Sequence, residues 1–139
     1  METKRPFTSI LAKLKDAGLR PTRQRLSLAK LLFEGGDRHV SAEDLHAEAV
    51  ANRIQVSLAT IYNTLHQFTS AGLLREVVVE PGRSYFDNNM SPHHHFFVEG
   101  EGKLMDISAD DVTLGRLPQP PKGMKVARVD VIVRLANDN

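Results

Sequence analysis

Apolar side chains recur at helical spacing in the first half of the chain, most clearly in the segment SLATIYNTLHQFTSAG. Its apolar positions lie at offsets 0, 3, 7 and 10, which predicts a helix with one buried face. We expect Ser57 to cap the start of this helix and Gly72 to end it. The predicted buried stripe consists of Leu58, Ile61, Leu65 and Phe68.

Three further helices are predicted before this one. The first ends at Gly18, because glycine tolerates the left-handed backbone of a helix C-terminus. The second runs from about Thr22 to the Gly35–Gly36 pair. The third begins at Ser41, since Ser41 and Asp44 have the spacing of a capping box.

The period of the pattern changes after Gly72. The segments LLREVVVE and RSYFD are typical of strands and PG of a turn, so residues 73–87 are predicted to form a hairpin. Helices followed by a hairpin indicate a winged helix-turn-helix. Farther on, HFFV, KLMDI and VARVDVIVRL (126–135) are predicted strands, and the proline-rich LPQPPKG cannot form a regular helix.

The predicted fold class is therefore α+β. Residues 1–87 are expected to form a winged helix-turn-helix DNA-binding domain, and residues 88–139 a small α/β dimerisation and ligand-sensing domain. The long apolar last strand indicates a homodimer interface.

Composition narrows the possible locations and chemistries. No segment approaches the roughly 18 apolar residues of a transmembrane helix, and the N-terminus has no signal-peptide core, so a cytoplasmic protein with no membrane partner is expected. The chain has no cysteine, which excludes disulfides, thiolate zinc sites and thiol nucleophiles. Any bound metal must be held by His, Asp or Glu.

The charge is unevenly distributed although the whole chain carries only +1. Residues 1–33 contain eight Lys and Arg side chains against two acids, a net charge of +6. This favours a polyanion as partner, and the alternative is a solvated basic surface without function.

The fourth predicted helix also has a polar face that is suited to reading DNA. Asn63 can make paired hydrogen bonds to adenine, and Tyr62 can press its ring on a thymine methyl. Arg20 is placed to enter a narrow, A·T-rich minor groove. The alternative is an ordinary surface helix. The predicted contacts to double-stranded DNA, including residues suited to phosphates, are Arg20, Arg23, Arg25, Ser57, Thr60, Tyr62, Asn63, His66 and Arg83.

Three consecutive histidines, His93, His94 and His95, precede an apolar run. On a strand, His93 and His95 share one face and His94 points to the other, so two different sites could meet here. A generic polar loop is the alternative. A metal site of nitrogen and oxygen ligands that bridges both domains is predicted, suited to Mn, Fe or Zn. Its predicted ligands are His39, Asp87, His95 and Asp106.

An enzyme is not expected. The spacing His93-x-His95-x-x-x-Glu99 imitates a cupin metal centre, but no histidine follows His95 to complete one. The sequence also has no H-E-x-x-H, no G-x-S-x-G and no phosphate-binding glycine loop.

Taken together, GLRPTRQRLSLAKLL, HVSAEDLHAEAV, SLATIYNTLHQFTSAGLL and SYFD…HHHFF resemble the ferric uptake regulator family over most of residues 18–107. The resemblance implies a dimeric winged-helix DNA-binding domain, a small α/β dimerisation domain and, in most members, metal-responsive repression. It also implies DNA contacts by Tyr62 and Arg20, and metal ligation by the four residues His39, Asp87, His95 and Asp106.

Departures from the family pattern indicate a subfamily. The usual Cys-x-x-Cys is replaced by Val98 and Glu101, a histidine of the last strand falls near Val129, and the arginine after the recognition tyrosine is Asn63. These features are similar to the iron response regulator branch. That likeness implies activity in low iron, control of iron and haem homeostasis genes, and release from DNA when haem binds around His93, His94 and His95. The alternative is a repressor that Mn or Fe activates as co-repressor.

Overall fold

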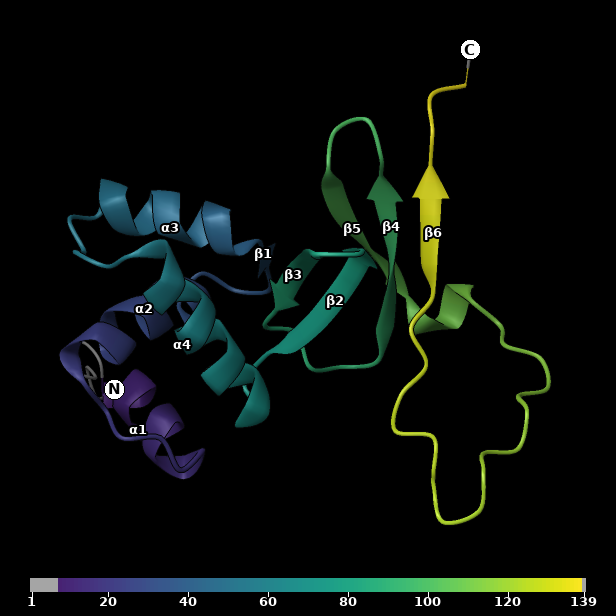
Figure 1. Ribbon diagram of the computed structural model, residues 1–139, viewed down its shortest axis with the longest axis horizontal. Helices are drawn as coiled ribbons and strands as arrows, with labels where there is room; N and C mark the ends of the chain where they lie inside the picture. The colour runs from purple at the N-terminus through teal and green to yellow at the C-terminus, as the bar shows by residue number, and fades with distance from the viewer. Residues whose placement is uncertain (1–7, 139) are drawn as a thin grey trace, which may run out of the picture. The chain divides into compact units, whose positions relative to one another are not determined.

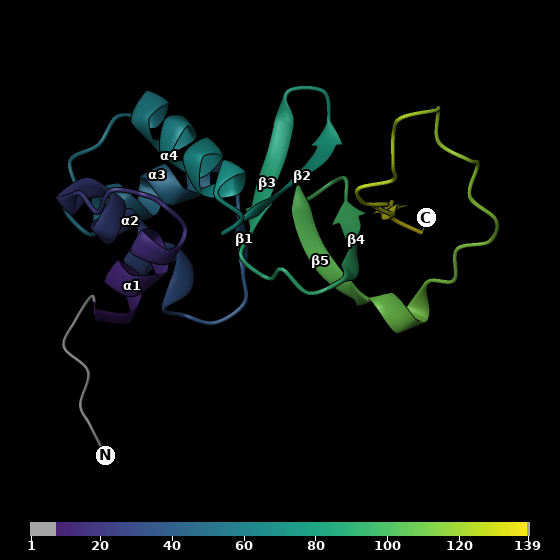
Figure 2. The same cartoon turned by 90° about the horizontal axis from the view of Figure 1, so that it is seen from below.

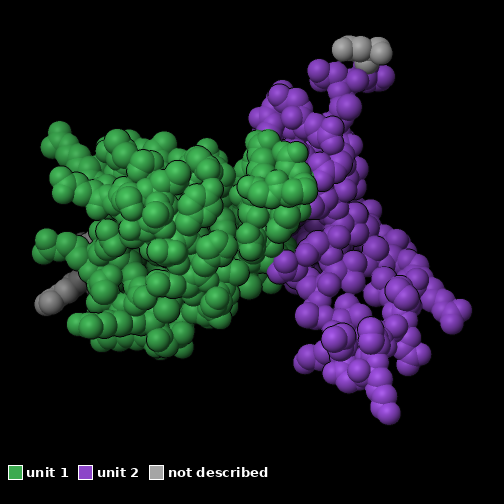
Figure 3. Space-filling view, viewed as in Figure 1, with its two compact units in different colours: residues 1–90 green, residues 91–139 purple. Residues whose placement is uncertain are grey.

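Residues 8–138 are described by a computed structural model, in which the chain forms two compact units, residues 1–90 and residues 91–139 (Figures 1 and 3). The boundary follows Met90, three residues beyond the predicted boundary at Asp87. The basic residues Lys4 and Arg5 lie outside the described residues.

Unit 1 combines a cluster of helices with a small sheet. Over its described residues the elements are α1 (Thr8–Asp16), α2 (Arg23–Phe33), β1 (His39–Val40), α3 (Ala42–Ala51), α4 (Leu58–Ser70), β2 (Arg75–Glu80) and β3 (Arg83–Asp87). The hairpin of β2 and β3 extends away from the helices (Figures 1 and 2), which is a winged-helix arrangement. This confirms the predicted order of helices and hairpin.

Side-chain caps fix where the helices begin. Thr22 accepts a hydrogen bond from the backbone of Arg25, and Ser57 accepts one from the third residue after it. Ser41 and Asp44 form a complete capping box at α3. Gly72 follows α4 with a φ of 82°, a left-handed conformation that favours glycine. The predicted start and end of these helices are thus confirmed.

The core of unit 1 lies where the helices meet the sheet. It includes Leu14, Leu28, Leu45, Ile61, Leu65, Phe68, Leu74 and Phe86. The predicted stripe on α4 was wrong at Leu58, which is 36% exposed, whereas Thr64 is 5% exposed. The buried stripe therefore begins one turn later than predicted, at Ile61, and Leu58 lies in the first turn, before the covered part of the helix.

Strand β1 was not predicted from the sequence. The sheet has the order β1-β3-β2, and every neighbouring pair is antiparallel. Asp87 is the partner of His39 on one side and of Arg75 on the other. A two-residue segment such as β1 carries no periodic pattern of its own, so only its pairing with β3 makes it a strand.

Unit 2 is built on a second three-stranded sheet. Its described elements are β4 (His93–Val98), β5 (Lys103–Ser108), the short 3-10 helix η1 (Ala109–Asp111) and β6 (Ile132–Leu135). The order is β5-β4-β6, with β5 antiparallel and β6 parallel to β4. A wide loop joins η1 to β6 (Figure 1).

The last strand is shorter than the predicted 126–135. Because β6 pairs with β4 in the register His95 to Ile132, Val126 would lie opposite Asn89, before β4 begins at His93. Among residues 8–138, the alternating segment ahead of β6 therefore has no strand to pair with. Over the described residues, none of the helices is both long and apolar enough to span a lipid bilayer.

Candidate functional site

Two histidines and a carboxylate share one face of the unit 2 sheet. In the β4–β5 ladder His95 pairs with Asp106, and His93 lies two residues before His95 on the same strand. His93 and His95 are 6% and 3% exposed, and their rings are 4.6 Å apart between centroids. The predicted alternation is confirmed, because His93 and His95 point to one face and His94 to the other.

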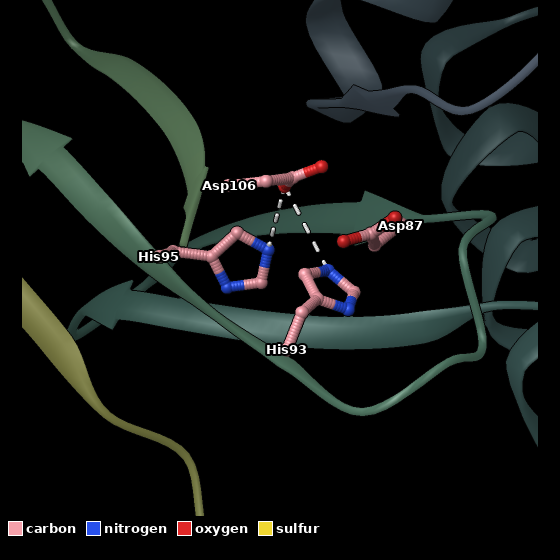
Figure 4. A group of neighbouring side chains, drawn as sticks. All are labelled: Asp87, His93, His95 and Asp106. Atoms are coloured by element: carbon pink, nitrogen blue, oxygen red, sulfur yellow. Dashed lines mark ion pairs between the residues drawn. The ribbon is translucent and has the colours of Figure 1, made fainter. Parts of the chain in front are cut away.

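The donor atoms of these side chains converge (Figure 4). The Nε2 atoms of His95 and His93 lie 3.4 Å and 3.7 Å from the same oxygen, Oδ1 of Asp106. The side chain of Asp106 is 44% exposed, so the cluster opens to solvent on the side of the carboxylate. Donor atoms this close together can ligate a single ion.

The proton on His93 can be located from its surroundings. Its Nδ1 lies 2.7 Å from the carbonyl oxygen of Ser91, and a carbonyl can only accept a hydrogen bond. Nδ1 of His93 therefore carries the proton, which leaves the lone pair of a neutral ring on Nε2, the atom near Asp106. A carbonyl that orients a histidine in this way is the usual support of a metal ligand.

The other two predicted metal ligands lie together in unit 1. His39 and Asp87 are partners across β1 and β3, and Asp87, which Figure 4 also shows, is 1% exposed. Arg75 continues the same row on β2 and is itself buried. The ring of Tyr85 lies edge-on to that of His39, at 6.4 Å between centroids.

Asn88 and Arg38 hold the ends of the β1–β3 pair. The amide nitrogen of Asn88 donates to the carbonyls of Leu32 and Gly36, and its amide oxygen accepts from the backbone of Arg38. The Arg38 guanidinium forms a two-pronged ion pair with Glu48, and this hydrogen bonding raises the pKa of Arg38. Sequence reasoning missed both residues, because neither belongs to a motif.

His94 has a different role from its neighbours. Its Nδ1 accepts a hydrogen bond of 3.1 Å from the backbone N–H of Val131, just before β6. The proton of a neutral His94 ring therefore lies on Nε2. Since His94 faces away from His93 and His95, the three predicted haem-binding histidines do not converge on one point in this structure.

The predicted DNA-reading face of α4 is exposed. Tyr62, Asn63 and His66 all lie on the surface, and the ring of His66 is edge-on to Phe86 at 5.5 Å. The hydroxyl of Tyr62 donates a hydrogen bond of 2.7 Å to Glu43 in the first turn of α3. This hydrogen bond is the main cause that raises the pKa of Tyr62 above its ordinary value of 10.0.

The arginines that are predicted to contact DNA have unequal surroundings. Arg20 and Arg23 are exposed. Arg25 donates twice to the side chain of Gln67 on α4 and once, at 2.8 Å, to the carbonyl of Arg20, so its guanidinium connects α2, the loop before it and α4. Arg83 on the hairpin pairs with Glu80 at 3.2 Å.

The two hydroxyl side chains at the start of α4 face each other. Besides capping α4, Ser57 Oγ lies 3.0 Å from the hydroxyl of Thr60.

Comparisons with known proteins agree with this architecture. Residues 16–133 match the model of the Ferric uptake regulator family. The chain is 38% identical over 100 residues to the ferric uptake regulation protein of Shigella flexneri, covering 71% of this chain and 68% of that protein. It is 37% identical to the ferric uptake regulation protein of Escherichia coli K12, with the same coverage.

Solved structures show the same fold. The ferric uptake regulator of Vibrio cholerae superposes with a TM-score of 0.71 at 25% identity, covering 91% of this chain and 98% of that one. The manganese-containing ferric uptake regulator of Pseudomonas aeruginosa gives a TM-score of 0.70 at 22% identity, covering 93% of this chain and 98% of that one.

Proposed function

The chain belongs to the ferric uptake regulator family, whose members are transcription regulators and not enzymes, and from this premise we propose that it is a sequence-specific regulator of iron and haem homeostasis genes. The exposed α4 face and the hairpin beside it support double-stranded DNA as its partner. The proposal includes an A·T-rich operator and a homodimer as the binding form, as expected from the sequence. The proposal includes a cytoplasmic location, because the protein must reach its DNA operator.

The observation that carries the regulatory part of the proposal is the convergence of imidazole nitrogen and carboxylate oxygen on one face of β4 and β5. A donor set of nitrogen and oxygen without sulfur suits Mn, Fe or Zn. The proposed ligands are those predicted from the sequence, His39, Asp87, His95 and Asp106, and the structure adds His93 as a donor on the same face.

When bound, the cation supplies a positive charge around which these side chains take one arrangement. Other residues of the chain already orient the proposed ligands. Ser91 holds His93 in the tautomer whose Nε2 carries the lone pair, and Asn88 fixes the end of β3 beside Asp87. Since the proposed ligands come from both units, ligation would restrict the motion of one unit against the other and so favour one DNA-binding arrangement.

The second candidate is haem as the regulatory ligand, with release from DNA on binding. The face of the sheet that carries His94 favours it, because Phe96, Met105 and Val133 lie together there in register, and Met105 and Val133 are 42% and 37% exposed. An apolar, accessible face beside an imidazole suits a porphyrin. His93 and His95 are buried on the opposite face, so His94 is the more accessible of the three.

Haem ligation at His94 would compete with a hydrogen bond of the fold. A neutral ring that binds iron through Nε2 carries its proton on Nδ1, and Nδ1 of His94 accepts from Val131. This hydrogen bond beside the start of β6 would be lost, whereas the backbone bond from His95 to Val131 would remain. This offers a physical route from haem binding to a changed sheet edge.

One titration separates the two candidates. A labelled duplex, selected by the protein from a random-sequence library, is followed by fluorescence anisotropy with chelator-treated protein, then with Mn²⁺, then with haem. Metal control predicts that binding appears with Mn²⁺ and is lost in the Asp106→Asn variant. Haem control predicts binding to the duplex without metal and release by haem, which His94→Ala would abolish. A protein that selects no sequence under any of these conditions would contradict the proposed function.

The ligand set is tested in the same protein. His39→Ala and His93→Ala are compared for Mn²⁺ affinity by calorimetry. Loss of affinity in His39→Ala supports the set predicted from the sequence, and loss in His93→Ala alone places the ion on the unit 2 face.

A further inference from the structure

A hydrogen bond links the exposed face of α4 to the first turn of α3. The Tyr62 hydroxyl donates to Oε1 of Glu43 at 2.7 Å, and both side chains lie on the surface of unit 1. Tyr62 stands beside Asn63, so the bond lies within the surface that is proposed to read bases. Its two residues are 19 positions apart in sequence and are brought together only by the packing of α3 on α4.

A carboxylate is an unfavourable neighbour for DNA. Glu43 and Asp44 both lie in the first turn of α3, where the helix dipole stabilises negative charge, so this helix N-terminus is no attractive site for a phosphate. If the face served only to attract the DNA backbone, Glu43 would oppose that role. A favourable role of Glu43 in DNA binding must therefore act through Tyr62, the residue to which it is hydrogen-bonded.

The bond restricts Tyr62 in two ways. It uses the only proton that the phenol can donate, so the hydroxyl is not available to donate to a phosphate oxygen while Glu43 holds it. It also fixes the ring before DNA is met, and a side chain that is already ordered loses less conformational entropy on binding. What the fixed ring presents to a duplex is its apolar surface, which suits a thymine methyl.

We propose that Glu43 is a positioning residue for base recognition, which holds the Tyr62 ring in the orientation that reads the operator and keeps its hydroxyl from the phosphates. The inference rests on the proposed function as a DNA-binding regulator and adds a specificity-determining residue to it. Glu43 lowers the general attraction of this surface to DNA and increases its discrimination between sequences.

The test compares selected and scrambled duplexes in the full-length protein. Wild-type protein selects a duplex from a random library, and dissociation constants are then measured by anisotropy at fixed salt. We expect Glu43→Ala to weaken binding to the selected duplex by up to about tenfold, because the Tyr62 ring must then be ordered on binding, and to leave binding to the scrambled duplex equal or tighter. Glu43→Gln keeps an acceptor oxygen and should recover most of the loss.

A double-mutant cycle ties the effect to Tyr62. Tyr62→Phe removes the donor, so it should reproduce the loss of Glu43→Ala, and the double variant should bind no more weakly than either single variant. Glu34→Gln, which removes an exposed acid elsewhere in unit 1, is the matched control for charge and should leave the ratio of the two dissociation constants unchanged.

Two results would overturn the inference while the proposed function stands. The first is that Glu43→Ala and Glu43→Gln tighten binding to both duplexes equally, as simple removal of repulsion predicts. The second is that the effects of Glu43→Ala and Tyr62→Phe add fully. Failure of the wild-type protein to select any sequence overturns the proposed function itself and base reading with it.

Discussion

His93, His95 and Asp106 illustrate how single atoms decide the chemistry of this protein. Their roles depend on which ring nitrogen is protonated, and the Ser91 carbonyl settles this for His93. The neighbouring His94 has the opposite arrangement, since its Nδ1 accepts from Val131. Two adjacent and chemically identical residues thus hold their protons on different nitrogens because they face different partners.

Asp106→Asn removes the charge of the carboxylate that both histidines approach, and we expect it to weaken Mn²⁺ binding by at least about tenfold, since even the loss of a supporting residue costs that much. Calorimetric titration of the full chain measures it. Asp110→Asn, an exposed acid on η1, is the control and should bind like the unaltered protein. Equal affinities in both variants would contradict a site at Asp106.

Tyr62 supplies a pH prediction. The hydrogen bond to Glu43 raises the pKa of Tyr62 above 10.0. The contribution of this bond to the free energy of unfolding is therefore fully present while the phenol is protonated, and it is lost as the pH rises through the raised pKa. In Glu43→Ala the pKa of Tyr62 should fall. The absorbance of tyrosinate, followed as the pH is raised into the alkaline range, measures the pKa of Tyr62. Tyr85 is the other tyrosine of the chain. An unchanged titration curve would show that the bond does not form in solution.

At the scale of elements, short sequence motifs place the helices and strand pairing places the strands. The capping box of Ser41 and Asp44 satisfies backbone groups of the first turn of α3. In that turn lies Glu43, so the cap also determines where the partner of Tyr62 is held. Strands β1 and β6, by contrast, exist only over the residues for which a neighbouring strand is present.

Removal of the cap should have a measurable cost. Ser41→Ala is expected to lower the free energy of unfolding by about 1 kcal/mol, the usual cost of losing a serine N-cap. Urea denaturation followed by circular dichroism measures it. Ser70→Ala, at the end of α4 where serine caps nothing, is the matched control and should change stability much less. A loss of equal size in both variants would mean that the cap contributes little.

At the scale of the whole molecule, charge distribution governs the encounter with DNA. The basic residues concentrate in the first 33 positions, and the exposed Arg20 and Arg23 lie at the start of α2 or just before it. Arg25 has a more internal position, since its guanidinium connects α2 to Gln67 of α4. Of the two arginines of α2 that were predicted to bind phosphates, the exposed Arg23 is thus the better candidate.

Salt dependence tests this distinction. If Arg23 contacts one phosphate, Arg23→Gln should make the slope of log K against log salt less negative by about 0.9, with similar weakening on all DNA sequences. Anisotropy titrations at several salt concentrations measure the slope. Arg116→Gln, an exposed residue of the loop in unit 2, should leave it unchanged. Identical slopes for the unaltered protein and Arg23→Gln would contradict a phosphate contact.

Much of this protein was determined by its sequence alone, because local features need no distant partner. Caps at Ser41 and Ser57, a helix start near Thr22, the change of period after Gly72 and the alternation of the three histidines were all predicted from neighbouring residues, and the structure confirms them. The four proposed metal ligands were also named from the sequence, as a prediction.

Only the tertiary structure decided what depends on residues far apart in the chain. The pairing of His39 with Asp87, the bond between Glu43 and Tyr62 and the late start of β6 all depend on segments that no periodic pattern connects. The positions of the protons on His93 and His94 were also decided by the tertiary structure, since each follows from the partner of the ring. Hydrophobic period and capping act over a few residues, whereas hydrogen-bond partners across elements are fixed only when the elements pack.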